Sequence, residues 1–490
     1  MKQNRRPNVV LCVCDQLRAF EAGCYGNAVI RTPNIDRLAA GGVRFDVACS
    51  NNPICCPARA ILLTGQHSRT CTGMRGNVGE PDAVRRHMPG TTIAEAFSAA
   101  GYDTASIGKW HVQPPPDAVG FDTFLRPAVP HRHSGRTFYH DSTAPFTADG
   151  WSWDFEMNHV RDFLAGRARA STRTGAGAST GGADGVGAGD GGDKPFFLYF
   201  NIEPPHMPLA DAPEEFLRMY RPEDVPLRPN VFVDGKLAYD AEWFKVYRWD
   251  YLYYREHLPE TEALPPGFDL RHLTALYYGL TTLMDRQVGR LCAALQAAGL
   301  AEDTLLIFVS DHGDNLGSHG SFNKYRLIEE SIRIPLIYHW PAALKPAVAR
   351  QQVTSLIDVM PTALALAGIP VPEGVQGSDV SPVVRGEQQT IGENAAYLEC
   401  IGDGGSIGIR TRDHLYAATL RDPSTYEYQP ANDEVADDRA MFFDLRDDPY
   451  EMNNLAKADA QPDVARDLRE RLLRWHRQTP WLRTLTPRGS

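Results

Sequence analysis

Two adjacent cysteines stand just before a predicted helix in the stretch NNPICCPARAILLTGQ, residues 51–66. Pro57 favours the first turn of a helix, because its fixed φ is already helical and its missing N–H is not needed there. Gly65 can end the helix. Either Cys55 or Cys56 would then lie at the amino end, where backbone N–H groups and the helix dipole favour an anion. A thiol in that position is expected to be a nucleophile of low pKa, whereas an inert buried pair is the alternative interpretation.

Four short apolar runs have the composition of buried parallel strands. They are Asn8–Cys14, Tyr102–Ile107, Phe196–Ile202 and Thr304–Ser310. Each run is followed closely by side chains that can do chemistry. In chain order these are Asp15 and Gln16, Lys109 and His111, His206, and Asp311 and His312, with Lys324 further along. Because the carboxyl ends of parallel strands meet at one edge of a sheet, we expect these side chains to converge on one site.

The carboxylates among these residues suggest a metal site. Asp15 and Asp311, with Gln16 and His312 beside them, offer oxygen and nitrogen ligands for one divalent cation. An Asp after a strand can instead cap the next helix, but two such positions in one set favour the metal. Mostly oxygen donors favour Ca²⁺ or Mg²⁺, and the imidazole leaves Mn²⁺ or Zn²⁺ open.

Helical patterns separate the apolar runs, at residues 32–42, 91–102 and 273–299. Strands that alternate with helices predict an α/β fold, with a large doubly wound, mixed but mainly parallel sheet flanked by helices. We assign residues 1–385 to this catalytic domain. Within it, residues 166–193 are of low complexity, and we predict a flexible insertion there.

The pattern changes after residue 385, where short alternating segments with polar turns predict antiparallel strands. The chain then reads QPDVARDLRERLLRWHRQ, with Val464, Leu468, Leu472 and Trp475 on one face of an amphipathic helix. Residues 386–490 are therefore predicted to form a smaller α+β subdomain, with an antiparallel sheet and a C-terminal helix.

The bulk composition is that of a globular enzyme-sized chain. Of the 490 residues 43% are apolar, and the net charge is −11 without a long basic cluster, so a nucleic-acid partner is not expected. We find no membrane-spanning run and no signal peptide, and predict a cytoplasmic protein. The nine cysteines are expected to be free and buried. The spacing of Cys12, Cys14, Cys55 and Cys56 does not suit a structural zinc site.

The stretch CCPAR followed by AILLTG resembles the signature of the sulfatase family, within the alkaline phosphatase superfamily. Further segments resemble that family in its usual order: TPNIDRLAAGGVRF, GKWH, EPPHMPL, SDHGD, NKYRLIEESIRIPLI and FFDLRDDPYEMNNLA. The resemblance implies that a maturation enzyme oxidises the signature cysteine to Cα-formylglycine. Counted from Cys55, Pro57 and Arg59 match the signature; counted from Cys56, Ala58 would stand in place of the proline. Cys55 is therefore the predicted nucleophile precursor.

The resemblance also implies roles for the other residues. The metal ligands would be Asp15, Gln16, Cys55, Asp311 and His312, around one divalent ion, most commonly Ca²⁺. The catalytic residues would be Cys55, Arg59, Lys109, His111, His206 and Lys324, with Asp311 as the base for the attacking hydroxyl. In this scheme His206, with Lys324, protonates the leaving group, and His111 takes a proton so that sulfate is eliminated. Two departures from the family pattern are Gln16, where many members have a second Asp, and Ala58, where Ser is commoner.

These residues together predict a sulfuric ester hydrolase acting on a small-molecule or carbohydrate sulfate ester. The nearest alternative is a phosphonate monoester or phosphodiester hydrolase, whose Gln and His ligands look similar to Gln16 and His312, although Lys109 and His111 look like a sulfatase set. A non-catalytic binding protein of the same fold is the other alternative. Three further histidines (His131, His133 and His140) and the aromatic run Trp243–His257 could line a leaving-group pocket or simply pack, and we predict no role for them.

Overall fold

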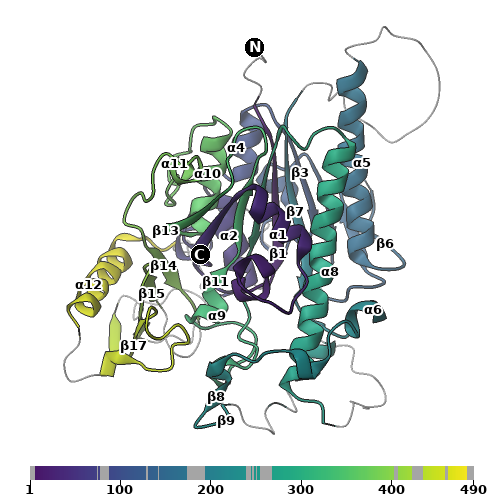
Figure 1. The fold of residues 1–490 in the computed structure, drawn as a ribbon. Helices are drawn as coiled ribbons and strands as arrows, with labels where there is room; N and C mark the ends of the chain where they lie inside the picture. The colour runs from purple at the N-terminus through teal and green to yellow at the C-terminus, as the bar shows by residue number, and fades with distance from the viewer. Residues whose placement is uncertain are drawn as a thin grey trace, which may run out of the picture.

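The structure is a computed structural model. It describes residues 6–73, 76–77, 88–128, 131–141, 143–173, 194–238, 244, 248–249, 251–253, 267–401, 407–421, 434–457 and 462–482. Within these ranges an 11-stranded sheet forms the centre of the molecule, and a 4-stranded antiparallel sheet lies beside it (Figure 1). The strand order of the large sheet is β11-β2-β12-β10-β1-β7-β3-β4-β5-β6, with β13 paired to β2.

The four predicted strands form the parallel middle of the large sheet. They are β1 (Asn8–Asp15), β3 (Asp103–Gly108), β7 (Phe196–Pro205) and β10 (Thr304–Ser310). β1 pairs in parallel with β10 on one side and with β7 on the other, and β7 pairs in parallel with β3. The remaining strands of this sheet are β2 (Val43–Cys49), β4 (Thr123–Pro127), β5 (Thr137–His140), β6 (Phe146–Thr147), β11 (Arg333–Ile334), β12 (Leu336–His339) and β13 (Ala347–Ser355). Several of these pair antiparallel, so the prediction of a mixed, mainly parallel sheet is confirmed.

Helices cover both faces of this sheet. Successive side chains of β1 point to opposite faces and pack in two different hydrophobic cores. Val10, Cys12 and Cys14 pack in the core under α1 (Pro33–Gly41), α5 (Ser152–Arg173) and α8 (Leu270–Ala297). Val9, Leu11 and Val13 pack in the opposite core, under α2 (Cys55–Thr64), α4 (Ile93–Ala99) and α10 (Val359–Leu366). Short helices complete the layer: α3 (Ser68–Cys71), α6 (Glu214–Leu217), α9 (Glu329–Ile332) and α11 (Ser381–Val384). The doubly wound arrangement is as predicted.

The C-terminal residues form the predicted α+β subdomain. Its strands are β14 (Ala396–Glu399), β15 (Ile407–Arg410), β16 (His414–Leu420) and β17 (Val435–Asp444), each antiparallel to the next. α12 (Asp463–Gln478) packs against this sheet and is drawn in yellow in Figure 1. Leu468, Leu472 and Trp475 are buried, and Val464 is partly buried, so the predicted apolar face is confirmed.

The start of the predicted flexible insertion is wrong. We placed it at Gly166, but α5 continues to Arg173, since the Arg- and Ala-rich stretch after Gly166 has high helix propensity. Arg167 contributes to the fold, because its guanidinium pairs with Asp103 at 3.0 Å and lies over the ring of Phe163. Residues 174–193 of that prediction lie outside the described residues.

All nine cysteines lie in the described ranges and are free, as predicted; seven are buried, whereas Cys24 and Cys292 are only partly buried. Among the helices that the structure describes, none combines the length and hydropathy needed to cross a bilayer.

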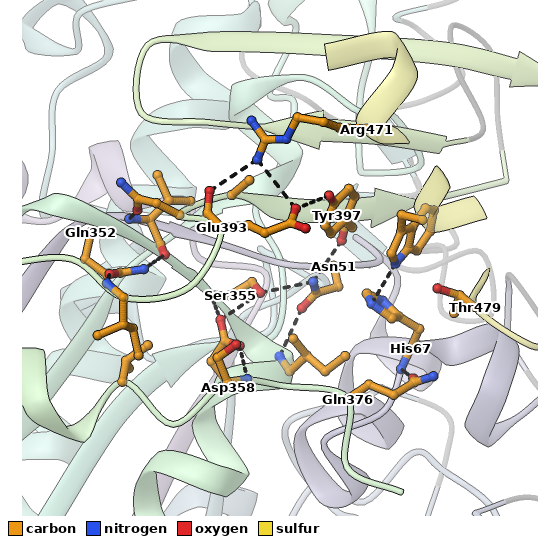
Figure 2. Close-up of a pocket in the computed structure, with 18 of the residues that line it drawn as sticks. Asn51, His67, Gln352, Ser355, Asp358, Gln376, Glu393, Tyr397, Arg471 and Thr479 are labelled. Atoms are coloured by element: carbon orange, nitrogen blue, oxygen red, sulfur yellow. Dashed lines mark hydrogen bonds and ion pairs between the residues drawn. The ribbon is translucent and has the colours of Figure 1, made fainter. Parts of the chain in front are cut away.

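A cavity of about 420 Å³ lies where the C-terminal subdomain meets the catalytic domain (Figure 2). Asn51 bridges the two parts, because its amide donates to the Ser355 hydroxyl at 3.1 Å and to the Tyr397 carbonyl at 2.9 Å. Arg471 of α12 contacts Glu393 at the rim. The predicted catalytic residues do not line this cavity.

Next to this cavity, a buried ion pair joins the two parts. Arg69 of α3 donates to Glu399 of β14 at 2.7 Å, and both side chains are fully buried. The Arg69 guanidinium also lies over the rings of Trp475 and Trp481, at 4.5 and 4.4 Å from their centroids. Removal of either partner would leave a buried charge without its counterion.

We expect Glu399→Ala to destabilise the protein by about 3 to 5 kcal/mol, since Arg69 would remain buried and unpaired. Urea unfolding followed by fluorescence measures this loss. The matched control is Asp224→Ala, which removes the carboxylate from the exposed Arg221–Asp224 pair and should leave the free energy of unfolding nearly unchanged. Equal effects of the two substitutions would contradict a junction that depends on the buried pair.

Candidate active site

Cys55 lies at the amino end of α2 and points into a cluster of polar side chains from distant segments. Its Sγ is 3.1 Å from Nε2 of His312, 3.0 Å from Nζ of Lys324 and 3.8 Å from Oδ1 of Asp15. The residue is 1% exposed. Cys56, by contrast, packs in the hydrophobic core under α2. The structure therefore brings Cys55, and not Cys56, to the carboxyl edge of the sheet.

The surroundings of Cys55 favour the thiolate. Burial alone would raise the pKa of this thiol, but Lys324, His312 and Lys109 outweigh it and hold the pKa well below its ordinary value. A hydrogen bond from His111 acts in the same direction. Residue 55 therefore sits where negative charge is stabilised.

Two buried carboxylates lie beside Cys55, at the ends of β1 and β10. Nη2 of Arg59 lies 3.0 Å from Oδ2 of Asp15 and 3.0 Å from Oδ2 of Asp311. Lys109 adds a contact of 2.7 Å to Asp15. Burial and the Cys55 thiol oppose ionisation of Asp15, but Lys109, His206 and Arg59 lower its pKa overall. Burial and the neighbouring Asp15 raise the pKa of Asp311.

Four of the five predicted metal ligands form one group. Asp15, Cys55, Asp311 and His312 each offer a ligand atom, and these atoms lie within 4.8 Å of one another. All four side chains are buried. Two carboxylate donors, an imidazole and the atom at position 55 are a donor set that suits a hard or borderline divalent cation, so the residues fit the predicted ion.

Gln16, the fifth predicted ligand, has its amide orientation set by its neighbours. Its NH₂ group donates to Oδ2 of Asp314 and, at 3.2 Å, to Oδ1 of Asn323. Its Oε1 therefore faces the site, where Nζ of Lys324 donates to it at 3.0 Å. Gln16 also has a φ of 66°, a left-handed conformation that is uncommon away from functional sites.

Lys324 and His206 also lie close to Cys55. Nζ of Lys324 is 3.0 Å from the Cys55 sulfur and 3.3 Å from Nε2 of His206. Nδ1 of His206 is 2.6 Å from the carbonyl of Met207, which makes it the donor, so Nε2 is the acceptor that faces Lys324. Burial, and then Lys109, lower the pKa of His206 to about 4. The imidazole is therefore neutral at pH 7, and the proton of this pair resides on Lys324.

Lys109 is held by a buried network that sequence analysis missed. Glu203, at the end of β7, accepts from His131 at 2.6 Å, lies 3.5 Å from Nζ of Lys109, and pairs with Arg136. Arg136 and Lys109 overcome the effect of burial and lower the pKa of Glu203 well below its usual range. The ring of His131 also stacks on His206 at 4.5 Å. Glu203 directly follows a predicted strand, as the candidate site residues do. Its position in the sequence was therefore the signal from which a role at the site could have been predicted.

His111 lies at the edge of the site. Its backbone φ is 50°, and its Nδ1 is buried without a hydrogen-bond partner among the described residues. A cavity of about 120 Å³, lined in part by Cys56, Trp110, His111 and Arg126, opens beside it. The preceding strand can reach this site because Gly108 has a φ of 96°, and a Cβ there would lie 2.0 Å from the carbonyl oxygen of Asn201.

The remaining candidates are divided between the site and its surroundings. His133 is fully buried, 3.8 Å from Glu203, whereas His140 pairs with Asp141 near the surface. Of the aromatic run 243–257, Trp243 and His257 lie outside the described residues. Tyr251 is described, and its hydroxyl donates to Asp314 at 2.8 Å.

Two family models and several known proteins match this chain. The family model described as Sulfatase matches residues 7–369, and the model for the C-terminal part of N-sulphoglucosamine sulphohydrolase matches residues 317–478. The chain is 29% identical to an arylsulfatase of Clostridium perfringens, over 96% of this chain and 94% of that protein. It is 28% identical to an ulvan-active sulfatase of Formosa agariphila, over 92% and 77%.

Solved structures share the whole fold. A sulfatase structure from Bacteroides fragilis superposes with a TM-score of 0.75 at 23% identity, covering 98% of this chain and 97% of that one. A structure solved in complex with its substrate, D-glucosamine-2-N,6-O-disulfate, superposes with a TM-score of 0.74 at 23% identity, covering 97% and 98%. The fold therefore has the alkaline phosphatase-like architecture of these proteins.

We expect protein produced without a maturation enzyme to show the ultraviolet absorbance of one thiolate at neutral pH. The reason is that the pKa of Cys55 is lowered, whereas burial raises the pKa of the thiols of Cys12, Cys14, Cys24, Cys49, Cys71 and Cys292. Cys55→Ala should abolish this absorbance, and Cys56→Ala should retain it. A pH titration in which Cys55→Ala keeps the signal would show that another thiol is the acidic one.

Proposed function

The chain belongs to the sulfatase family and is a sulfatase, and from this premise we propose that it hydrolyses its sulfate ester through the hydrate of a Cα-formylglycine at position 55, beside one divalent cation. One observation carries this proposal: residue 55 projects from a helix tip to within 3.1 Å of His312 and 3.0 Å of Lys324. Asp15 and Asp311 lie next to the same atom in the buried group of four possible ligands.

The proposed modification suits the buried position of residue 55. A hydrated aldehyde supplies an oxygen nucleophile that can later release its product by re-forming the aldehyde, so that one hard step becomes two easier ones. Asp311 is the proposed base for the attacking hydroxyl, and the raised pKa of this carboxyl increases its affinity for a proton. His111, which forms a hydrogen bond with the side chain at position 55, is placed to take a proton from the remaining hydroxyl.

Asp15, Gln16, Asp311 and His312, with residue 55, would hold the cation. When bound, the ion would offset negative charge on the sulfuryl oxygens and orient the nucleophile. The donor atoms are mostly carboxylate and amide oxygens, so we propose Ca²⁺, with Mg²⁺ or Mn²⁺ as the alternatives. Arg59 keeps Asp15 and Asp311 in place through its two 3.0 Å contacts.

Lys109 and Lys324 supply the positive charge that an anionic group needs in a protein with a net charge of −11. Both ammonium groups are buried, and although burial alone would lower their pKa values, the neighbouring anions outweigh this effect and raise them, so both are charged at neutral pH. Fixed charges of this kind stabilise developing negative charge without reorganisation. Lys324 also holds the proton that the leaving oxygen requires, and His206 keeps its ammonium in position.

We propose a carbohydrate sulfate as the substrate class. The support comes from relatives: an ulvan-active sulfatase, an N-acetylglucosamine-6-O-sulfatase of Bacteroides thetaiotaomicron (26% identical, over 93% of this chain and 83% of that protein) and the structure in complex with glucosamine disulfate. A panel of monosaccharide sulfates that differ in the position of the ester would test this assignment.

We expect Cys55→Ala to abolish turnover of an aryl sulfate, with kcat/KM reduced by a factor on the order of 10⁴ or more, because the nucleophile is absent. Cys56→Ala is the matched control and should keep most of the activity, since its side chain packs in the core. Mass spectrometry of the peptide Phe45–Arg59, from protein co-expressed with a maturation enzyme, should show an aldehyde at residue 55.

Two outcomes would contradict this assignment. If Cys56→Ala folds normally and is as inactive as Cys55→Ala, the register of the signature is wrong. If the wild type hydrolyses an aryl phosphonate faster than the matching aryl sulfate, the alternative phosphonate monoester hydrolase is favoured. The fold alone does not separate the two, because the phosphonate monoester hydrolase of Agrobacterium radiobacter superposes with a TM-score of 0.67 at 22% identity.

We expect His206→Gln to slow esters of poorly acidic alcohols by a factor of about 10² to 10³, because such leaving groups need a proton and His206 positions the Lys324 ammonium that supplies it. Esters of acidic phenols should be affected much less, since they leave without protonation. The measurement is kcat/KM against leaving-group pKa for both proteins. An equal loss on all esters would instead assign His206 to substrate binding.

A further inference from the structure

A second group of metal-binding side chains lies outside the candidate active site. It consists of His319, Glu330 and Glu451, each of which offers a ligand atom within 4.8 Å of the others. His319 lies in a 3-10 helix (Ser318–Gly320), and Glu330 lies in α9. Glu451 follows β17 in the C-terminal subdomain. We call these three residues the junction triad.

The two carboxylates of the junction triad are buried, and each has one oxygen without a hydrogen-bond partner in the described part of the chain. Glu330 is 0% and Glu451 3% exposed. Oε1 of Glu330 accepts from Arg228 and Asn230, both at 2.7 Å, and Oε2 of Glu451 accepts from the backbone N–H of Glu329 at 3.0 Å. Oε2 of Glu330 and Oε1 of Glu451 are buried and have no hydrogen-bond partner among the described residues. Buried carboxylate oxygens without a partner are strongly destabilising.

Arginines surround these carboxylates, but each of them pairs with an acid other than Glu451. Arg228 pairs with Glu330, and Arg410 pairs with Glu329, both at 2.7 Å. Among the described residues, no Lys or Arg lies within ion-pair distance of Glu451. Within the described ranges, Glu451 is therefore the carboxylate of the junction triad that lacks a counterion.

His319 presents its imidazole to the two carboxylates, with a ligand atom within 4.8 Å of each. Nε2 of the ring lies 3.2 Å from the Asn230 amide, which also donates to Oε1 of Glu330. A cation bound through Nε2 would therefore take the place of the Asn230 contact. The backbone of His319 adopts a φ of 51°, which is uncommon for a residue other than glycine.

We propose that His319, Glu330 and Glu451 form a second divalent-cation site, which is structural and separate from the catalytic centre. One imidazole and two carboxylates suit a borderline cation such as Zn²⁺ or Mn²⁺. The ion would link Glu451 of the C-terminal subdomain to Glu330 and His319. Because these two residues flank Lys324 in sequence, the site would fasten the segment that carries Lys324 to the C-terminal subdomain.

Zinc titration against a chromophoric chelator tests this proposal on the full-length protein. In every protein described below, Asp311→Asn is combined with Cys55→Ala; together they remove two of the four possible ligands of the catalytic group and leave the junction triad intact. We expect Asp311→Asn to bind one equivalent of Zn²⁺, and Asp311→Asn with Glu451→Gln to bind none. Added Zn²⁺ should raise the melting temperature of the first of these proteins and not that of the second. Glu156→Gln is the matched control. Glu156 is also a buried carboxyl, whose pKa is raised by burial to about 8, but it lies outside the junction triad.

The alternative is that Glu330 and Glu451 share a proton. In that case Glu451→Gln would mimic the protonated acid, keep or raise the melting temperature, and leave zinc binding unchanged; this result would overturn the proposal. If Glu451→Gln does not fold, His319→Asn replaces it, because Asn tolerates a positive φ better than most residues. Retention of the zinc equivalent by Asp311→Asn with His319→Asn would likewise overturn it. Loss of activity caused by Asp311→Asn and Cys55→Ala reports on the catalytic site and not on the junction triad.

Discussion

Burial of opposite charges at the carboxyl edge of the central sheet is the constraint on which the site depends. Asp15, Asp311 and Arg59 are all fully buried, and the guanidinium contacts both carboxylates at 3.0 Å. Breaking a buried ion pair leaves an isolated buried charge, which is strongly unfavourable. β1, β10 and α2 must therefore keep the relative positions that preserve these contacts. Arg59 lies one helical turn after Cys55, and the same contacts therefore also fix the direction in which residue 55 points.

The same constraint accounts for the amide at position 16, where many sulfatases have a second Asp. The NH₂ group of Gln16 donates to the Asp314 carboxylate, which Tyr251 also contacts. A carboxylate at position 16 would place two buried acids in contact, with no proton donor between them. Because burial already raises the pKa of Asp314, a further anion would be unfavourable. The amide of Gln16, which departs from the family pattern, is therefore consistent with the buried carboxylate beside it, Asp314 of the SDHGD segment.

Much of the architecture could be predicted from the sequence because the relevant signals are local. The apolar runs before Asp15, Lys109 and Asp311 mark parallel strands, and parallel strands necessarily bring their carboxyl ends to one edge. The position of Glu203 after a strand was visible in the same way, but its role was not, since its partners His131 and Arg136 come from a connection without a periodic pattern, and only the three-dimensional structure brings them together. The continuation of α5 past Gly166 was missed for a different reason: low complexity hid a stretch of good helix formers.

The catalytic helix is held from two directions, which explains why the C-terminal subdomain matters for a site it does not enter. On the inner side, Arg59 of α2 is paired with the carboxylates of the sheet. On the outer side, α3 follows α2 closely, and its Arg69 is paired with Glu399 of β14 and enclosed by Trp475 of α12. The subdomain also reaches the segment of Lys324, through the pair between Arg410 and Glu329. The subdomain therefore contacts both α3, which follows the helix of residue 55, and the segment that carries Lys324. A shift of the subdomain would change the distance between residue 55 and Lys324 before it changed any contact within the central sheet.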